Sequence, residues 1–214
     1  MGWERLERIR RRDLVVLLAG GSGLLFGAAA HAQPATCPSD GTPMQFVPKR
    51  PPDPAAADND VEKYPSCPYC GMDRRKFHHA RMLVVYGDDV PDPTCSLHCA
   101  AISLSINIDR GPKAIHVADA GTAGDLKPLI DAQRATFLVG SALPGVMTRR
   151  SKVAYGAEAA ARAAQGAGGG ELVDFERALV AAYADMAQDV AMIRKNRDER
   201  RRRMPAHSET RSVP

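Results

Sequence analysis

Short β-rich apolar runs alternate with one helical stretch in the first half of the chain. Residues 81–86 form an apolar run that predicts a strand, and a shorter extended segment follows at 92–95. Ser96 is suited to cap a helix that continues to about Ile106. Residues 115–118 predict a further strand. The predicted order is strand, strand, helix and strand.

The second half repeats this order, although the two halves share negligible sequence identity. Residues 135–140 and 151–155 predict two strands, and an Ala-rich helix at 157–165 ends at a run of glycines. Residues 172–175 predict a third strand. The pattern therefore predicts an α+β fold made of two similar small ββαβ subdomains, which we assign to residues 64–122 and 134–175.

A long helix is predicted to follow the second subdomain, over residues 176–203. Apolar residues recur there at steps of three and four, which puts them on one helix face: Phe175, Leu179, Tyr183, Met186, Val190 and Ile193. The basic run at 194–203 suits the C-terminal end of a helix dipole, and weak contact with an anionic membrane surface is the alternative. We predict a disordered tail at 204–214.

The first 32 residues are typical of an export signal. A cluster of arginines precedes an apolar run at 14–30, and Ala30-His31-Ala32 provides a signal-peptidase site. The pair Arg11-Arg12 also resembles a twin-arginine signal, so export by either the Sec or the twin-arginine route is open. An uncleaved membrane anchor is the alternative. We expect a periplasmic protein.

Seven prolines in residues 33–63 predict a flexible linker between this signal and the first subdomain. The linker contains Cys37 and Met44, to which we assign no role. No lipidation motif precedes Cys37. The net charge of only +4 over 214 residues gives no indication of nucleic-acid binding.

Four of the five cysteines are arranged as two knuckles, Cys67-x2-Cys70 and Cys95-x3-Cys99. The hairpin predicted between the knuckles would bring them together on one metal ion. Thiolates are soft ligands that select Cu(I) or Zn over hard cations.

Two methionines favour copper over zinc. Met72 follows Cys70 by two residues, and Met147 lies in a predicted turn, where it has no apolar helix face to pack on. Thioethers bind Cu(I) readily, whereas Zn makes little use of them. The candidate metal ligands are thus Cys67, Cys70, Met72, Cys95, Cys99 and Met147. A histidine could complete the site, the candidates being His78, His79, His98 and His116.

Three other interpretations of the cysteines are open. All four could hold a structural zinc ion in an interaction module, or they could form disulfides in an exported domain. The tetrapeptide Cys67-Pro-Tyr-Cys70 also occurs in glutaredoxins, where a strand precedes it and a helix follows it. Neither element is predicted around Cys67, so the redox interpretation has little support.

Residues 64–175 resemble the NosL family of copper chaperones, which assist the maturation of nitrous-oxide reductase. The resemblance lies in Cys67-Pro-Tyr-Cys70-Gly-Met72, in Cys95-Ser-Leu-His-Cys99, and in the segment from Ala135 to Met147. The first half alone also resembles the YHS and TRASH metal-binding modules.

The resemblance implies two ββαβ subdomains and one Cu(I) ion held by Cys70, Met72 and Met147, with Cys67 close by. It implies a carrier that is not an enzyme, whose partners are a copper enzyme and its assembly machinery, including an associated ABC transporter. The chain departs from the family in its missing lipidation motif, its additional cysteine pair and its long basic C-terminal helix.

Overall fold

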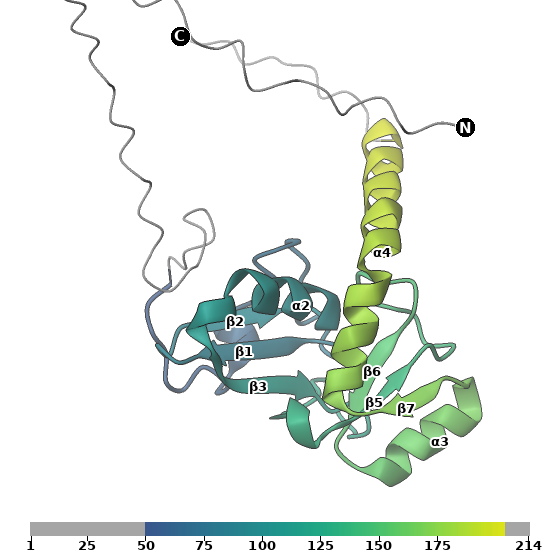
Figure 1. The fold of residues 1–214 in the computed structure, drawn as a ribbon, viewed down its shortest axis with the longest axis horizontal. Coiled ribbons are helices and arrows are strands. Elements are labelled where there is room, and N and C mark those ends of the chain that lie inside the picture. Colours follow the sequence, from purple (N-terminus) through teal and green to yellow (C-terminus); the bar gives the residue numbers. More distant parts are fainter. Residues whose placement is uncertain (1–49, 204–214) are drawn as a thin grey trace, which may run out of the picture. The chain divides into compact units, whose positions relative to one another are not determined.

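The computed structural model describes residues 50–203, and these residues fold into two small antiparallel sheets with helices packed on them (Figure 1). The predicted signal, most of the predicted linker with Cys37 and Met44, and the predicted tail at 204–214 lie outside the described residues. Within residues 50–203, no helix has both the length and the apolar character needed to cross a membrane.

The first unit is built on a four-stranded sheet with the strand order β2-β1-β3-β4. The interior strand β1 is buried along its whole length, which fits a strand with neighbours on both sides. In chain order the elements are α1 (Asp60–Lys63), β1 (Met82–Tyr86), β2 (Pro91–Thr94), α2 (Leu97–Ile106), the 3-10 helix η2 (Ile108–Arg110), β3 (Pro112–Ala118) and β4 (Leu129–Asp131).

The second unit has a three-stranded sheet with the order β6-β5-β7. Its elements are the 3-10 helix η3 (Ala132–Arg134), β5 (Thr136–Val139), β6 (Lys152–Tyr155), α3 (Glu158–Gly168) and β7 (Glu171–Val173). In both units the first strand of the ββαβ sequence is central, the second lies on one side and the third on the other. The predicted α+β fold with a repeated ββαβ order is confirmed, and β4 is an additional strand that the pattern did not predict.

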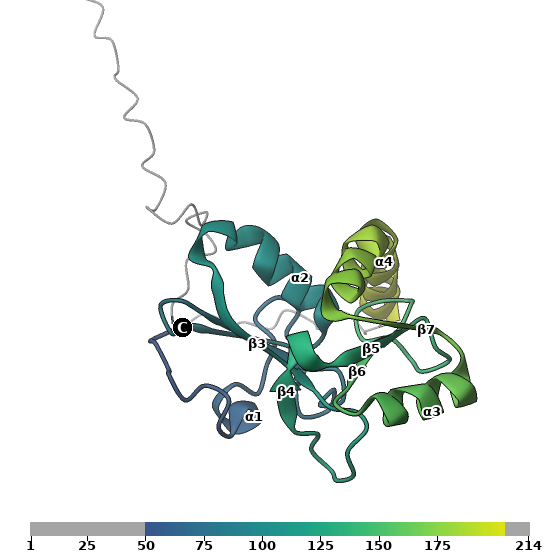
Figure 2. The same ribbon diagram turned by 60° about the horizontal axis from the view of Figure 1, so that its bottom comes forward.

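One hydrophobic core joins the two sheets to α2 and to the long helix α4 (Phe175–Arg203). Helices α2 and α4 lie side by side, and α3 covers the second sheet (Figure 2). The sheets are also linked through Asp119, whose side chain accepts hydrogen bonds from the backbone of Gly121 and Gly156. The two units are therefore packed against each other as parts of one structure.

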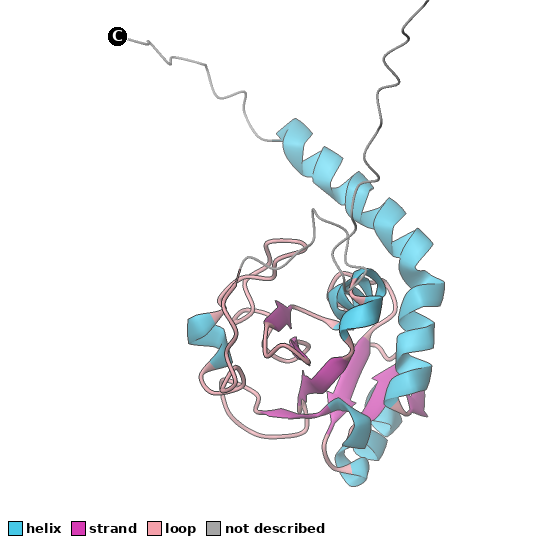
Figure 3. Ribbon diagram, turned by 60° about the vertical axis from the view of Figure 1, so that its left-hand side comes forward, coloured by secondary structure: helices cyan, strands magenta, loops and turns pink. Residues whose placement is uncertain are grey.

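The buried seam of α4 is centred on small residues, Ala178 and Ala182, which follow the buried Phe175. The apolar face predicted from the sequence does not coincide fully with this seam. Tyr183, which belongs to the predicted face, is 41% exposed. Alanines let α4 approach α2 and the sheets closely, and larger side chains such as Leu179 and Met186 pack at the margins. The last turns of α4 extend beyond the strands (Figure 3).

Residues 50–63 differ from the prediction of a flexible linker. Ala56 and Val61 are each only 2% exposed, and Ala56 packs with Leu83 and Val85 of β1. The short helix α1 also carries Asp60, whose buried carboxylate binds two arginines. A proline-rich sequence therefore covers one face of the first sheet, because its few apolar residues find partners far along the chain.

Candidate metal centre

The four cysteines of the two knuckles converge on one point. Among the described residues, the Sγ atoms of Cys67, Cys70, Cys95 and Cys99 all lie within 4.8 Å of one another. The Cys70 and Cys95 sulfurs are 3.4 Å apart, and those of Cys95 and Cys99 are 3.8 Å apart. All four are free thiols, and these separations far exceed the roughly 2.05 Å of a disulfide bond.

A tight turn forms the first knuckle. The backbone N–H of Cys67 donates to the carbonyl of Met72 at 2.9 Å, and Gly71 N–H donates to the carbonyl of Cys67 at 2.9 Å. Gly71 has a φ of +74°, a left-handed conformation that glycine adopts without steric penalty. From Arg74 to Ala80 the chain continues in turns rather than in a helix. The knuckle thus lacks the helix that a glutaredoxin-type thiol requires.

The second knuckle is placed by the junction of a strand and a helix. Cys95 directly follows β2, and Cys99 lies in the first turn of α2, for which Ser96 is the N-cap residue. Both cysteines are fully buried, whereas Cys70 on the first knuckle is half-buried. The cluster therefore has a closed side made by α2 and a more open side at Cys70.

Arg74 ties the two knuckles to each other. Its buried guanidinium donates to the carbonyl of Tyr64 at 2.8 Å and to that of Thr94 at 3.2 Å, the segments that lead into Cys67 and Cys95. It also forms an ion pair of 2.8 Å with Asp60, which in turn binds Arg81 at 3.0 Å. This role could not be predicted from the sequence, since an arginine within a polar stretch normally lies on the surface.

Met72 and Met147 both pack against the cysteine cluster, although they come from different units. Met147 lies in the loop between β5 and β6 and has a φ of +61°, which is uncommon for a residue other than glycine. Local strain of this kind persists where the surroundings hold it in place, and it often marks a functional site. The structure thus brings together all six candidate ligands that the sequence named.

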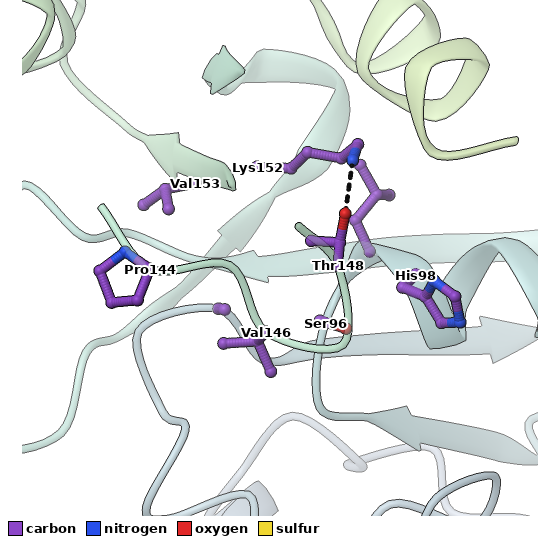
Figure 4. Close-up of a pocket in the computed structure, with 9 residues that line it drawn as sticks. Ser96, His98, Pro144, Val146, Thr148, Lys152 and Val153 are labelled. Atoms are coloured by element: carbon purple, nitrogen blue, oxygen red, sulfur yellow. Dashed lines mark hydrogen bonds between the residues drawn. The ribbon is translucent and has the colours of Figure 1, made fainter. Parts of the chain in front are cut away.

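Contacts from β6 and α4 hold the Met147 loop, which also lies beside His98 of α2 (Figure 4). Lys152 on β6 donates to the hydroxyl of Thr148 at 3.1 Å and forms an ion pair of 2.8 Å with Asp185 on α4. Val146 of the loop and His98 of α2 line the same small cavity. The position of Met147 is therefore set by β6, α2 and α4 together.

Close contact shifts the thiol pKa values in opposite directions. Hydrogen bonds from Cys70, Cys95 and Cys99 hold the pKa of Cys67 well below its usual range. The pKa values of Cys95 and Cys99 are raised, first by their hydrogen bonds to Cys67 and then by burial among other causes. Negative charge therefore concentrates on the first knuckle, and a metal ion that binds all four sulfurs must displace protons from the second.

Of the four histidines considered as ligands, His98 lines the smaller cavity beside the cluster, together with Cys70 and Cys99. Its Nδ1 is 3.5 Å from Asp189 Oδ2 on α4, and neither atom has a hydrogen-bond partner among the described residues. Burial lowers the pKa of His98, which favours the neutral imidazole. His78 accepts a backbone hydrogen bond from Lys127, and His116 lies within β3.

These residues fit a soft metal ion. A tetrahedral ion with bonds of about 2.3 Å to sulfur has sulfur–sulfur edges of about 3.8 Å, and the Cys95–Cys99 separation is 3.8 Å. Two cavities of about 490 Å³ and 200 Å³ adjoin the cluster, and both are lined by Cys70 and Met147. Cys70 and both thioethers therefore line the larger cavity, whereas Cys99 lines the smaller one together with Cys70 and Met147.

Two similarities link this chain to known proteins. The sequence-family model of NosL matches residues 58–180. The crystal structure of the copper chaperone NosL from Shewanella denitrificans is 24% identical in sequence, with a TM-score of 0.45, and the match covers 52% of this chain and 87% of that one. No curated protein matches the chain. The resemblance found in the sequence is confirmed by the family match, which spans more than half of the residues. This chain is a member of the NosL family.

Proposed function

We propose that this protein is a Cu(I)-binding metallochaperone that delivers copper to a copper enzyme. The observation that carries the proposal is the gathering of four thiols and two thioethers, from both ββαβ units, beside an open cavity. Thiolate and thioether sulfur are the ligands that select Cu(I). Membership of the NosL family of copper chaperones supports the same cargo.

The difference in burial between the two sides of the cluster fits a copper carrier without enzymatic activity. Cys67, Cys95 and Cys99 are buried, whereas Cys70, Met72 and Met147 are only partly buried and line the large cavity. A partner could thus approach the ion from the thioether side and take it by exchange of ligands. Thioethers are neutral, so they hold Cu(I) without the additional charge of further thiolates.

Membership of the NosL family supports nitrous-oxide reductase and its assembly machinery, with the associated ABC transporter, as the partners. The sequence of residues 1–32 supports delivery in the periplasm after export. Deleting the gene should leave the cells with copper-poor nitrous-oxide reductase, which copper analysis of the purified reductase would detect. A fully loaded reductase in the deletion strain would rule out this client while leaving copper binding intact.

The ligand assignment is tested by anaerobic titration with Cu(I) in competition with a chromophoric chelator. Replacing Met72 and Met147 together by alanine should lower the affinity for Cu(I) at least tenfold, a loss of about 1.4 kcal/mol or more of binding free energy. The affinity for Zn²⁺ should stay unchanged in the same variant, because zinc makes little use of thioethers. An unchanged Cu(I) affinity would show that the two methionines are not ligands.

A structural zinc site is the second candidate, favoured by the burial of three of the thiols and by the 3.8 Å edge between Cys95 and Cys99. It predicts one tightly held Zn²⁺ per chain after purification and loss of structure when zinc is removed. Elemental analysis followed by circular dichroism with and without a chelator separates the two candidates. Retention of the fold without any metal would reject the zinc module.

A further inference from the structure

The last turns of α4 form one wall of the cavity above the metal centre. The family match ends at residue 180, so these turns lie outside it. The opposite wall contains Cys70, Met72 and Met147. The α4 wall consists of Met192, Ile193, Asn196, Arg197 and Arg200. A segment beyond the family match therefore faces the open side of the centre.

The spacing of these residues shows that one face of α4 is turned toward the cavity. Met192, Asn196 and Arg200 follow one another at steps of four, and Ile193 and Arg197 form the adjacent row. Of these five side chains, Met192 alone provides a soft donor atom. Methionine has three rotatable bonds, so its sulfur can adjust to the position of a bound ion.

Comparison with Met186 distinguishes Met192 from a methionine that only fills space. Met186 lies on the same helix and packs against the main hydrophobic core. Met192 is half-buried and lines the cavity that also contains Cys70 and two other methionines. The two methionines of α4 thus occupy different chemical surroundings, and only one of them lies beside candidate ligands.

The arginines of the same wall also suit a soft cargo. Arg197 and Arg200 place positive charge at the cavity, which repels hydrated hard cations. Cu(I) gains strong bonds to sulfur that such cations do not form. A neutral thioether on α4 can therefore bind the ion in a cavity whose charge discourages other metals.

We propose that Met192 is a further ligand of the bound soft metal ion, which it holds from the α4 side together with Cys70, Met72 and Met147. This proposal rests on the proposed function, since it assigns an additional ligand to the same cargo. It also gives a role to the C-terminal extension, which would complete the open side of the centre. The ion stays Cu(I) throughout, and only its sulfur ligands change.

The test uses the purified protein with methyl-¹³C-labelled methionine, titrated anaerobically with Cu(I) buffered by a chromophoric chelator. We expect the methyl signals of Met72, Met147 and Met192 to shift together up to one equivalent of Cu(I). The signal of Met82, which is fully buried in β1, should not shift. Met192→Leu keeps the size and helix propensity of the side chain, and it should weaken Cu(I) binding about tenfold.

Met186→Leu is the matched control, because it makes the same change on the same helix away from the cavity, and its Cu(I) affinity should equal that of the wild type. The proposal is overturned if the Met192 signal stays fixed while those of Met72 and Met147 shift, even if Met192→Leu binds more weakly, since the residue then has only a packing role. It is also overturned if Met192→Leu binds Cu(I) with unchanged affinity. In both cases the proposed function stands.

A wild-type protein that binds no Cu(I) would instead reject both the proposed function and the role of Met192.

Discussion

Arg74 illustrates how one buried side chain can fix the relative position of two ligand-bearing segments. Its guanidinium bonds to carbonyls before both knuckles and to the Asp60 carboxylate, with no part of the side chain exposed. Removing Arg74 would leave Asp60 with Arg81 as its remaining arginine partner, and it would take this donor away from the carbonyls of Tyr64 and Thr94. Loss of partners by buried charged and polar groups is strongly destabilising. Arg74 therefore matters for the metal centre although it is not a candidate ligand.

Replacing Arg74 by methionine should lower the free energy of unfolding by about 3–5 kcal/mol. Urea denaturation followed by circular dichroism measures the change. Arg75→Met is the control, because Arg75 forms an exposed ion pair with Glu62 and such pairs contribute little. Equal stability of the two variants would show that Arg74 does not support the knuckles.

Gly145 has a comparable role in the loop that presents Met147. A Cβ at Gly145 would lie 2.2 Å from the carbonyl oxygen of Thr148, so any side chain forces the loop to move. Gly145→Ala should therefore displace Met147 and weaken Cu(I) binding, as measured by chelator competition. Gly166→Ala changes a glycine in α3 that has open space around it, and should leave Cu(I) binding as it is. Equal Cu(I) affinity in both variants would contradict a fixed loop.

At the scale of elements, the local pattern predicted the strands and helices well, because each ββαβ element has a clear run of apolar residues. The convergence of the two knuckles could also be predicted, because the pattern predicted a hairpin between them. The position of residues 50–63, the bond network of Arg74 and the wall formed by Met192 could not be predicted. Each of these depends on contacts between distant segments, which no periodicity along the chain encodes.

Helix α4 is attached to the second unit by a charged contact as well as by its apolar seam. Asp185 forms ion pairs of 2.8 Å with Lys152 and 2.9 Å with Arg150. Burial alone would raise the pKa of Asp185, but the hydrogen bonds and charges of Lys152 and Arg150 outweigh it and lower the pKa below the usual 3.8. The ionised carboxylate therefore stabilises the docked helix.

Because the folded pKa of Asp185 is depressed, its contribution to stability is complete above the unfolded pKa and is lost as the pH falls through the folded one. Asp185→Asn should lower the melting temperature at about pH 7, and the difference from the wild type should shrink toward about pH 3 and below. Thermal unfolding over this range tests the effect. A difference that is independent of pH would show that the charge of Asp185 is not involved.

At the scale of the whole molecule, the candidate ligands come from both units, and the units share one hydrophobic core. An ion bound at the centre would therefore stabilise the two units together. A ligand that binds only the folded state at 100 times its Kd adds about 2.7 kcal/mol to the stability.

Loading with Cu(I) should therefore raise the midpoint temperature of unfolding, and the protein should still unfold in a single transition. Calorimetry under anaerobic conditions measures both. Removing copper with a chelator should reverse the shift. Two separate transitions, of which only one responds to copper, would contradict ligation across both units. Met147→Ala is informative here, since it removes the only candidate ligand of the second unit and should reduce the shift.

The wide separation of the candidate ligands along the chain has a consequence for the order of events in the cell. Cys67 and Met147 meet only when both sheets have formed, so a nascent or unfolded polypeptide lacks the complete set of candidate ligands. If the protein crosses the membrane in the unfolded state, it crosses without copper bound at the complete site and takes up copper after transport. Transport in the folded state would instead allow loading before transport. If the proposed export occurs, its route would therefore decide which compartment supplies the metal.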